Sequence, residues 1–186
     1  YTPLDLTNRE IRLVRRCVDR KTNTSPKDEY NISVVSLDSA PAYTALSYVW
    51  GSSERSREIK CNGKRLPTTD SLYRLLERSR LSDADWLWAD AVCIDQDNLL
   101  ERSSQVAFME EIYSRAARVA IYLDGFSDTE ANAMYELCKY SFRYLQDGTK
   151  ADSYTRGISM DQLQSLVKLF SHPWFSRSWV LQELVI

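Results

Sequence analysis

Residues 85–95 read DWLWADAVCID, and this stretch decides the fold class. It is apolar on both faces, which is expected of a central parallel strand that is covered on both sides. Residues 98–116 follow with apolar side chains at helical spacing, and residues 118–125 (RVAIYLDG) again have the pattern of a strand. Strand, helix and strand within about 40 residues form a right-handed βαβ unit. The sequence therefore predicts an α/β fold.

The N-terminal third has the patterns of antiparallel strands. Residues 10–19 and 30–37 carry β-branched side chains on either side of a polar stretch, which predicts an antiparallel pair with a long loop. Residues 43–51 (YTALSYVWG) predict a third strand. Asn62-Gly63 lies between two short strands and is the strongest short hairpin signal.

Two further helical patterns flank these strands. Residues 68–80 predict a helix capped by Thr69 or Asp70, with Leu72, Leu75 and Leu76 on one stripe. In the crossover helix, Asn98 and Glu101 have the spacing of a capping box. Residues 129–145 and 159–170 predict two more amphipathic helices. In the first of these, the expected buried face contains Ala131, Met134, Cys138, Phe142 and Leu145.

Composition excludes several classes of protein. The chain has 186 residues, 44% hydrophobic and 27% charged, with a net charge of −2, so neither nucleic acid nor an anionic membrane is an expected partner. The four cysteines form no CxxC pair, which predicts reduced, mostly buried thiols and a cytoplasmic location. No signal peptide or long apolar run is expected. The single histidine, His172, is expected to be part of a loop, and no metal site or bound cofactor is predicted.

Residues 174–186 (WFSRSWVLQELVI) predict a C-terminal helix, because Val180, Leu181, Leu184 and Val185 form a helical stripe that strand alternation does not explain. Glu183 lies one turn after Trp179, at the border of that stripe. Glu183 is either a solvated helix acid or an acid directed into a pocket, and spacing alone does not distinguish the two.

Ligands in open α/β sheets bind beyond the carboxyl ends of the strands. Those ends supply the candidate binding residues, which are Ser47, Tyr48, Trp50, Gly51, Asp95 and Gln96. Asp90 is expected inside an apolar strand and needs hydrogen-bond partners there. It is either a satisfied core acid or a functional one. Asp95 and Gln96 are either a turn or part of a site, and Cys93 is expected to be a core residue.

Four blocks of the sequence, taken in order, resemble the fungal HET (heterokaryon incompatibility) domain. They are YTALSYVWG, LWADAVCIDQDNLLERSSQV, IYSRAARVAIYLDG and WFSRSWVLQEL. The resemblance implies a cytosolic trigger of regulated cell death in fungal non-self recognition. We therefore expect one HET domain over residues 1–186, which is either truncated at its C-terminus or completes its sheet differently from a TIR domain. Its expected parts are a hairpin region (9–40), an α/β core (43–125), a helical insertion (126–171) and a C-terminal helix (174–186).

The same blocks are similar, more remotely, to Toll/interleukin receptor (TIR) domains, which implies a flavodoxin-like core. The segment SRSWVLQELV resembles the TIR pattern that contains the catalytic glutamate of the NAD-cleaving members. The resemblance therefore implies a catalytic role for Glu183 and a substrate-placing role for Trp179, with NAD as substrate. Val180 replaces a cysteine that is common in that pattern.

Two functions follow as expectations. The first is a NAD glycohydrolase that assembles as a homo-oligomer on activation, in which a carboxylate stabilises an oxocarbenium-like state. Expected phosphate contacts are the amides near Gly51, Arg55 or Arg57, and the helix N-terminus at Asn98. The second is a non-catalytic module that oligomerises and recruits other signalling proteins, for which exposed tryptophans would be interface anchors.

Overall fold

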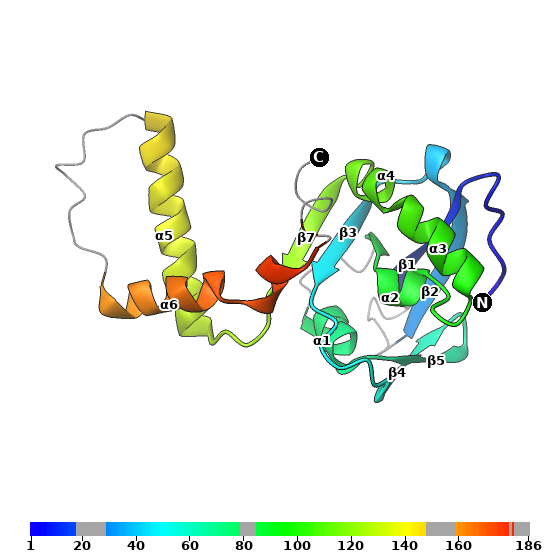
Figure 1. The fold of residues 1–186 in the computed structure, drawn as a ribbon, viewed down its shortest axis with the longest axis horizontal. Helices are drawn as coiled ribbons and strands as arrows, with labels where there is room; N and C mark the ends of the chain where they lie inside the picture. Colours follow the sequence, from blue (N-terminus) through cyan, green and yellow to red (C-terminus); the bar gives the residue numbers. More distant parts are fainter. Residues whose placement is uncertain (18–28, 79–84, 148–158, 179, 181–186) are drawn as a thin grey trace. The chain divides into compact units, whose positions relative to one another are not determined.

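The computed structural model describes residues 1–17, 29–78, 85–147, 159–178 and 180 (Figure 1). The chain divides into two compact units, one of Tyr1–Tyr122 with Ser178–Ile186 and one of Leu123–Arg177. The first unit contains a sheet and the second contains helices.

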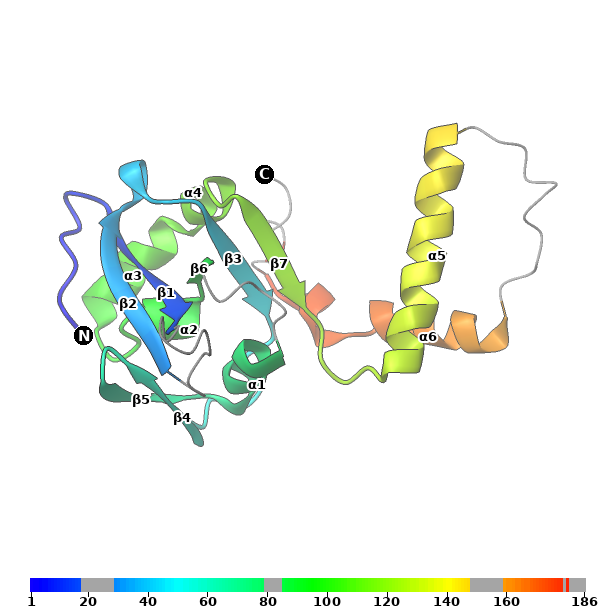
Figure 2. The same cartoon turned by 180° about the vertical axis from the view of Figure 1, so that it is seen from behind.

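A mixed seven-stranded sheet forms the described part of the first unit, with the order β5-β4-β2-β1-β6-β3-β7 (Figures 1 and 2). The strands are β1 (Glu10–Arg16), β2 (Glu29–Ser36), β3 (Tyr43–Tyr48), β4 (Arg57–Cys61), β5 (Lys64–Thr68), β6 (Trp86–Trp88) and β7 (Arg118–Tyr122). Strand β3 is parallel to both neighbours, β6 and β7, whereas β1 runs antiparallel to β2 and β6. The α/β class is confirmed.

The predicted antiparallel elements are confirmed. Strands β1 and β2 pair along their whole length, from Glu10 opposite Ser36 to Arg16 opposite Tyr30. The β4–β5 turn has positive φ at Asn62 (51°) and Gly63 (75°), which matches the twist of a two-residue hairpin. The Asn62 side chain also bonds both backbone groups of Ile32, so it joins the hairpin to β2.

Helix α1 (Asp70–Arg78) follows the hairpin. Thr69 caps it, since its Oγ1 accepts a hydrogen bond from the Leu72 amide at 3.3 Å. Leu72, Leu75 and Leu76 are buried, as their spacing predicted.

The crossover between β6 and β7 contains three helices instead of the one that the pattern predicted. They are α2 (Asp90–Cys93), α3 (Leu99–Ala107) and α4 (Met109–Ser114), and α3 and α4 lie along one face of the sheet (Figures 1 and 2). The break comes at Phe108, which caps the end of α3 and the start of α4. The buried residues Met109, Ile112 and Tyr113 keep the predicted apolar face across the break.

The prediction that residues 85–95 form one strand was wrong after Trp88. Strand β6 has three residues, and Asp90 begins the short helix α2. Continuous burial caused the error, because an unbroken apolar run fits a buried helical turn as well as a buried strand. The core is otherwise as expected, and the rings of Trp88 and Tyr113 meet edge to face with centroids 5.5 Å apart.

The second unit contains α5 (Asp128–Asp147), α6 (Met160–Phe170) and a short 3-10 helix, η3 (Pro173–Ser176). Ser159 and Gln162 form a complete capping box at the start of α6. Of the predicted buried face of α5, Ala131 and Cys138 are exposed and Met134 is half-buried. The side chains of Phe142 and Leu145 lie outside the described part, so their burial stays a prediction.

Candidate functional site

The candidate site begins where β3 ends. Trp50 follows this strand, and its indole Nε1 donates to both carboxylate oxygens of Asp90, at 3.1 and 3.0 Å. Asp90 also accepts from the Ala91 amide at 2.8 Å, which fixes the carboxylate at the start of α2. The structure therefore joins two predicted residues that lie 40 positions apart in the chain.

Gln96 extends the same cluster. Its side-chain Nε2 donates to the backbone oxygen of Asp90 at 2.8 Å. Trp50, Asp90 and Gln96 are thus connected by hydrogen bonds at the carboxyl ends of β3 and β6, and we call these three residues the β3–β6 cluster. Asp90 and Gln96 are both half-buried. A ligand at this end of the sheet would meet groups whose positions are already fixed.

Ser47 and Tyr48 are both buried at the end of β3, and Tyr48 lies close to Asp90. The Tyr48 hydroxyl makes no well-formed hydrogen bond among the described residues. Burial, reinforced by the negative charge of Asp90, raises the pKa of that hydroxyl well above its ordinary value. Tyr48 is therefore neutral at physiological pH.

Gly51 has a backbone conformation that the loop requires. Its φ is +65°, and a Cβ at this position would lie 3.0 Å from the Ser71 Oγ of α1. Gly51 is thus restricted by its backbone conformation and by its contact with Ser71. Its predicted role in binding stays a prediction.

The backbone of Asp95 is held by Glu101, which forms a buried ion pair with Arg12. The Asp95 amide donates to Glu101 Oε1 at 2.7 Å, and Glu101 pairs with Arg12 through both oxygens, at 2.5 and 2.9 Å. Arg12 also donates to the Cys93 backbone oxygen at 3.0 Å. The side chains of Arg12 and Glu101 are only 1% and 5% exposed, so this contact is part of the core.

The predicted capping box at Asn98 is only half formed. Asn98 accepts from the Glu101 amide at 3.2 Å, but the Glu101 carboxylate turns to Arg12 and to the Asp95 amide. Burial alone would raise the pKa of Glu101. Hydrogen bonds from Arg12 and from that amide outweigh burial and lower the pKa below its ordinary value. Glu101 is therefore a structural carboxylate.

Sequence reasoning missed the Arg12–Glu101 pair. One signal was present, because Arg12 shares its face of the strand with the apolar Val14, two residues further on. A cation inside a buried strand needs an acidic partner. The identity of that partner, 89 positions away, is visible only in the folded chain.

Both arginines that were candidate phosphate contacts are already paired. Arg55 binds Asp97 through two parallel hydrogen bonds of 2.8 Å, and Arg57 binds Asp70 at 2.9 Å. All four side chains are exposed by at least a third. An anionic ligand would therefore have to displace an exposed carboxylate, which costs little at the surface.

Trp179 and Glu183 lie outside the described residues, so their predicted roles stay predictions. Val180 between them is described, and it is buried. His172 belongs to a loop as predicted, since its Nδ1 accepts from the Trp174 amide at 3.2 Å. Cys93 is a core residue, and burial raises the pKa of its thiol to about 12, so it is not ionised as a nucleophile at neutral pH.

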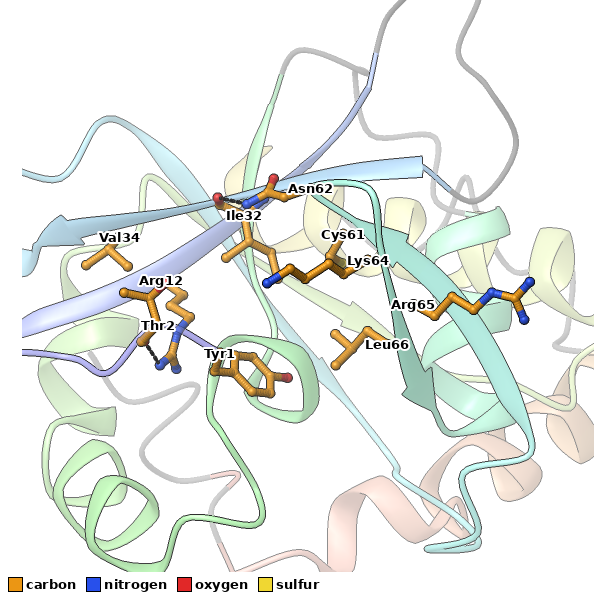
Figure 3. Close-up of a pocket in the computed structure, with 10 residues that line it drawn as sticks. All are labelled: Tyr1, Thr2, Arg12, Ile32, Val34, Cys61, Asn62, Lys64, Arg65 and Leu66. Carbon is orange, nitrogen blue, oxygen red and sulfur yellow. Dashed lines mark hydrogen bonds between the residues drawn. The ribbon is translucent and has the colours of Figure 1, made fainter.

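A cavity of about 250 Å³ lies elsewhere in the first unit (Figure 3). Strands β1, β2, β4 and β5 and the first two residues form it, and Figure 3 shows Lys64 extending across it while Arg65 points away. Its walls combine Ile32, Leu66 and the Tyr1 ring with Arg12. Among the described residues, none of the predicted site residues lines this cavity.

The described ranges contain neither a cluster suited to a metal ion nor a helix suited to a membrane. No group of three His, Cys, Asp or Glu side chains there has the arrangement of a metal site. No helix in the same part of the chain combines the length and the apolar character that crossing a membrane demands.

Comparison with known proteins identifies relatives. Residues 43–183 match the model of the family described as heterokaryon incompatibility protein (HET). The chain is 30% identical to heterokaryon incompatibility protein 6, OR allele, of Neurospora crassa, in an alignment that covers 78% of this chain and 28% of that protein. The chain thus spans less than a third of the curated relative. No solved structure gives a significant match.

Proposed function

The chain belongs to the heterokaryon incompatibility (HET) family, and from this premise we propose that it acts in fungal non-self recognition by cleaving NAD at the nicotinamide–ribose bond. The consequence would be regulated cell death, with NAD drawn from the cytoplasm as a substrate and not held as a cofactor. The Neurospora relative is a heterokaryon incompatibility protein by name, which supports the recognition role. The resemblance to NAD-cleaving TIR domains is the reason for proposing the reaction.

The observation that carries the proposal is the β3–β6 cluster of Trp50, Asp90 and Gln96. Its strands belong to a parallel set, in which the first strand along the chain (β3) lies between the second (β6) and the third (β7). This is the 2-1-3 arrangement of flavodoxin-like sheets, whose ligands bind at the carboxyl ends of the strands. The arrangement supports the proposed TIR-like core.

In the proposed reaction, the bond between the ribose C1′ and the nicotinamide nitrogen breaks. Both bonding electrons go to the nitrogen, so nicotinamide leaves as a neutral molecule. The oxocarbenium-like ribose then takes up water, and one proton passes to the solvent. Glu183 would stabilise the positive charge on the ribose, and the Trp179 ring would stack on nicotinamide.

The β3–β6 cluster would bind and orient this substrate. Asp90 is held by Trp50 and by an amide, so it presents a fixed acceptor for a ribose hydroxyl without a rotamer search. Tyr48 is buried and neutral with its hydroxyl close to the Asp90 carboxylate, so it would support Asp90 and not contact the substrate. The amides around Gly51 and the exchangeable Arg55 would face the diphosphate.

The test is a nicotinamide-release assay with wild type, Glu183→Gln and the control Glu110→Gln, an exposed acid of α4. We expect Glu183→Gln to lose on the order of 10²–10⁴-fold in turnover and Glu110→Gln to keep it. All three proteins are first compared by circular dichroism. Equal turnover in wild type and Glu183→Gln would remove the glutamate from the mechanism.

The second candidate function is a non-catalytic module that assembles and recruits signalling proteins. An exposed apolar face on α6, described below, favours it. A folded wild type that releases no nicotinamide at any concentration, also as part of a longer natural chain, would replace the enzyme with this candidate.

A further inference from the structure

Helix α6 exposes a continuous apolar stripe on its outer face. Met160, Leu163, Val167 and Phe170 are 68%, 46%, 61% and 67% exposed, respectively. Their spacing of three, four and three residues places them on one side of the helix. Phe175, 42% exposed, continues the patch, because its ring lies 5.7 Å from that of Phe170. We call these five side chains the α6 stripe.

The stripe is not the face that holds α6 in its own unit. Ser165, on the opposite side of the helix, is buried, and Leu166 and Leu169 are half-buried. Lys168 binds Glu130 of α5 at 2.7 Å. Packing within the helical unit therefore explains the inner face, and it gives no reason for large apolar side chains on the outer one.

We propose that the α6 stripe is a self-association surface, on which two copies of this chain pair through an antiparallel α6–α6 contact. The four α6 residues of the stripe are placed symmetrically about residue 165, because 160 and 170 are equally far from it and so are 163 and 167. A twofold axis near this point sets Met160 against the second copy's Phe170 and Leu163 against its Val167. Such self-complementarity is what an isologous dimer interface requires.

Charge is compatible with a second copy as the occupant. The two charged residues of α6, Asp161 and Lys168, lie well away from the stripe at 100° per residue. The exposed residue beside the stripe is Gln164, whose neutral amide can both donate and accept. Two identical surfaces therefore meet without like-charge repulsion, and antiparallel helices also oppose their dipoles favourably.

The area predicts a weak dimer. A large apolar side chain presents roughly 150–250 Å² when fully exposed, so five that are about half exposed offer roughly 500 Å². Two copies together would bury about 1,000 Å², which is the lower limit for a specific interface. We therefore expect an equilibrium between monomer and dimer that depends on concentration.

The test measures molar mass by sedimentation equilibrium on the 186-residue chain, from about 1 µM to about 1 mM, a range that brackets weak interfaces. We expect the mass to rise toward that of a dimer in wild type and to stay monomeric in Val167→Glu. The matched control is Asn132→Glu, which adds the same charge on an exposed position of α5 and should dimerise normally. A monomeric wild type, or a Val167→Glu protein that dimerises as well as wild type, would overturn the proposal.

Orientation is tested by disulfide trapping in a Cys138→Ser background, since Cys138 is an exposed thiol. A mixture of Met160→Cys and Phe170→Cys proteins should form a crosslinked heterodimer on oxidation, because the antiparallel contact pairs these positions. Met160→Cys alone should form far less. Equal crosslinking in both samples would contradict the twofold arrangement. These results do not depend on NAD cleavage, which is measured separately.

Discussion

Replacing Glu101 by Gln should destabilise the first unit more than any exposed charge change in the chain. Glu101 is the partner of a fully buried arginine, and it makes three hydrogen bonds at 2.5 to 2.9 Å, two of them to Arg12 and one to the Asp95 amide. Removal of one member of a buried pair costs about 3–5 kcal/mol, because the remaining charge stays in the core without compensation. The amide oxygen of Gln can still accept one bond, so the lower end of that range is expected.

The assay is thermal unfolding at pH 7, followed by circular dichroism and calorimetry. For a chain of this size each kcal/mol lowers Tm by roughly 2–4 °C, so we expect a decrease of about 6–12 °C from a loss of about 3 kcal/mol. The matched control is Glu29→Gln, which breaks the exposed pair with Lys60 at 3.0 Å. An exposed pair contributes about 0–1 kcal/mol, so its Tm should move by no more than about 4 °C.

A decrease below about 2 °C for Glu101→Gln would refute the reasoning, because it would mean that water or rearrangement compensates the arginine. The double variant Arg12→Met/Glu101→Leu separates charge burial from packing. Apolar residues of similar volume often replace a buried ion pair without loss. We therefore expect the double variant to be more stable than Glu101→Gln, and a double variant as unstable as the single one would point to the hydrogen bonds instead.

Three further predictions concern the same region. Gly51→Ala should lower the free energy of unfolding by about 1–2 kcal/mol in urea titration, since the new Cβ would have a positive φ and lie 3.0 Å from the Ser71 Oγ. Trp50→Phe keeps a ring but removes the donor to Asp90, so stability should fall by about 1–3 kcal/mol in the same titration, and nicotinamide release should fall if Asp90 binds the ribose. The pKa of Glu101 is lowered in the folded state, so its stabilisation is complete above the unfolded value of about 4.3 and is lost as the pH falls through the lower folded pKa. Wild-type Tm should therefore fall more steeply in acid than the Tm of Glu101→Gln, and parallel curves would contradict this.

Local patterns were sufficient for most of the secondary structure. The Asn62-Gly63 turn, the Thr69 cap and the leucine stripe of α1 each depend on residues close together in the chain, and each is confirmed. The same reasoning failed at Asp90 and at Phe108. In both places the apolar pattern continues unchanged while the backbone changes from strand to helix or interrupts a helix. Periodicity records which residues are buried, and it does not record where a backbone element ends.

The candidate site shows the same limit. Trp50 and Gln96 could be named as candidates from the predicted strand ends, and Asp90 as an acid within an apolar run. Their connection through hydrogen bonds appears only in the fold, because it joins loops from different strands. The roles of Trp179 and Glu183 stay predictions, since they lie outside the described residues.

The sequence by itself determined the α/β class, the hairpins and the membership of the HET family, because these depend on periodicity, turn chemistry and ordered motifs. Only the tertiary structure decided that Arg12 pairs with Glu101, that Arg55 is held by Asp97, and that the α6 stripe faces outward. The physical reason is common to all three. The sequence shows that a charged side chain needs an opposite charge and that an apolar side chain needs to be buried. Whether a distant group satisfies that need, and which one, depends on how the whole chain packs.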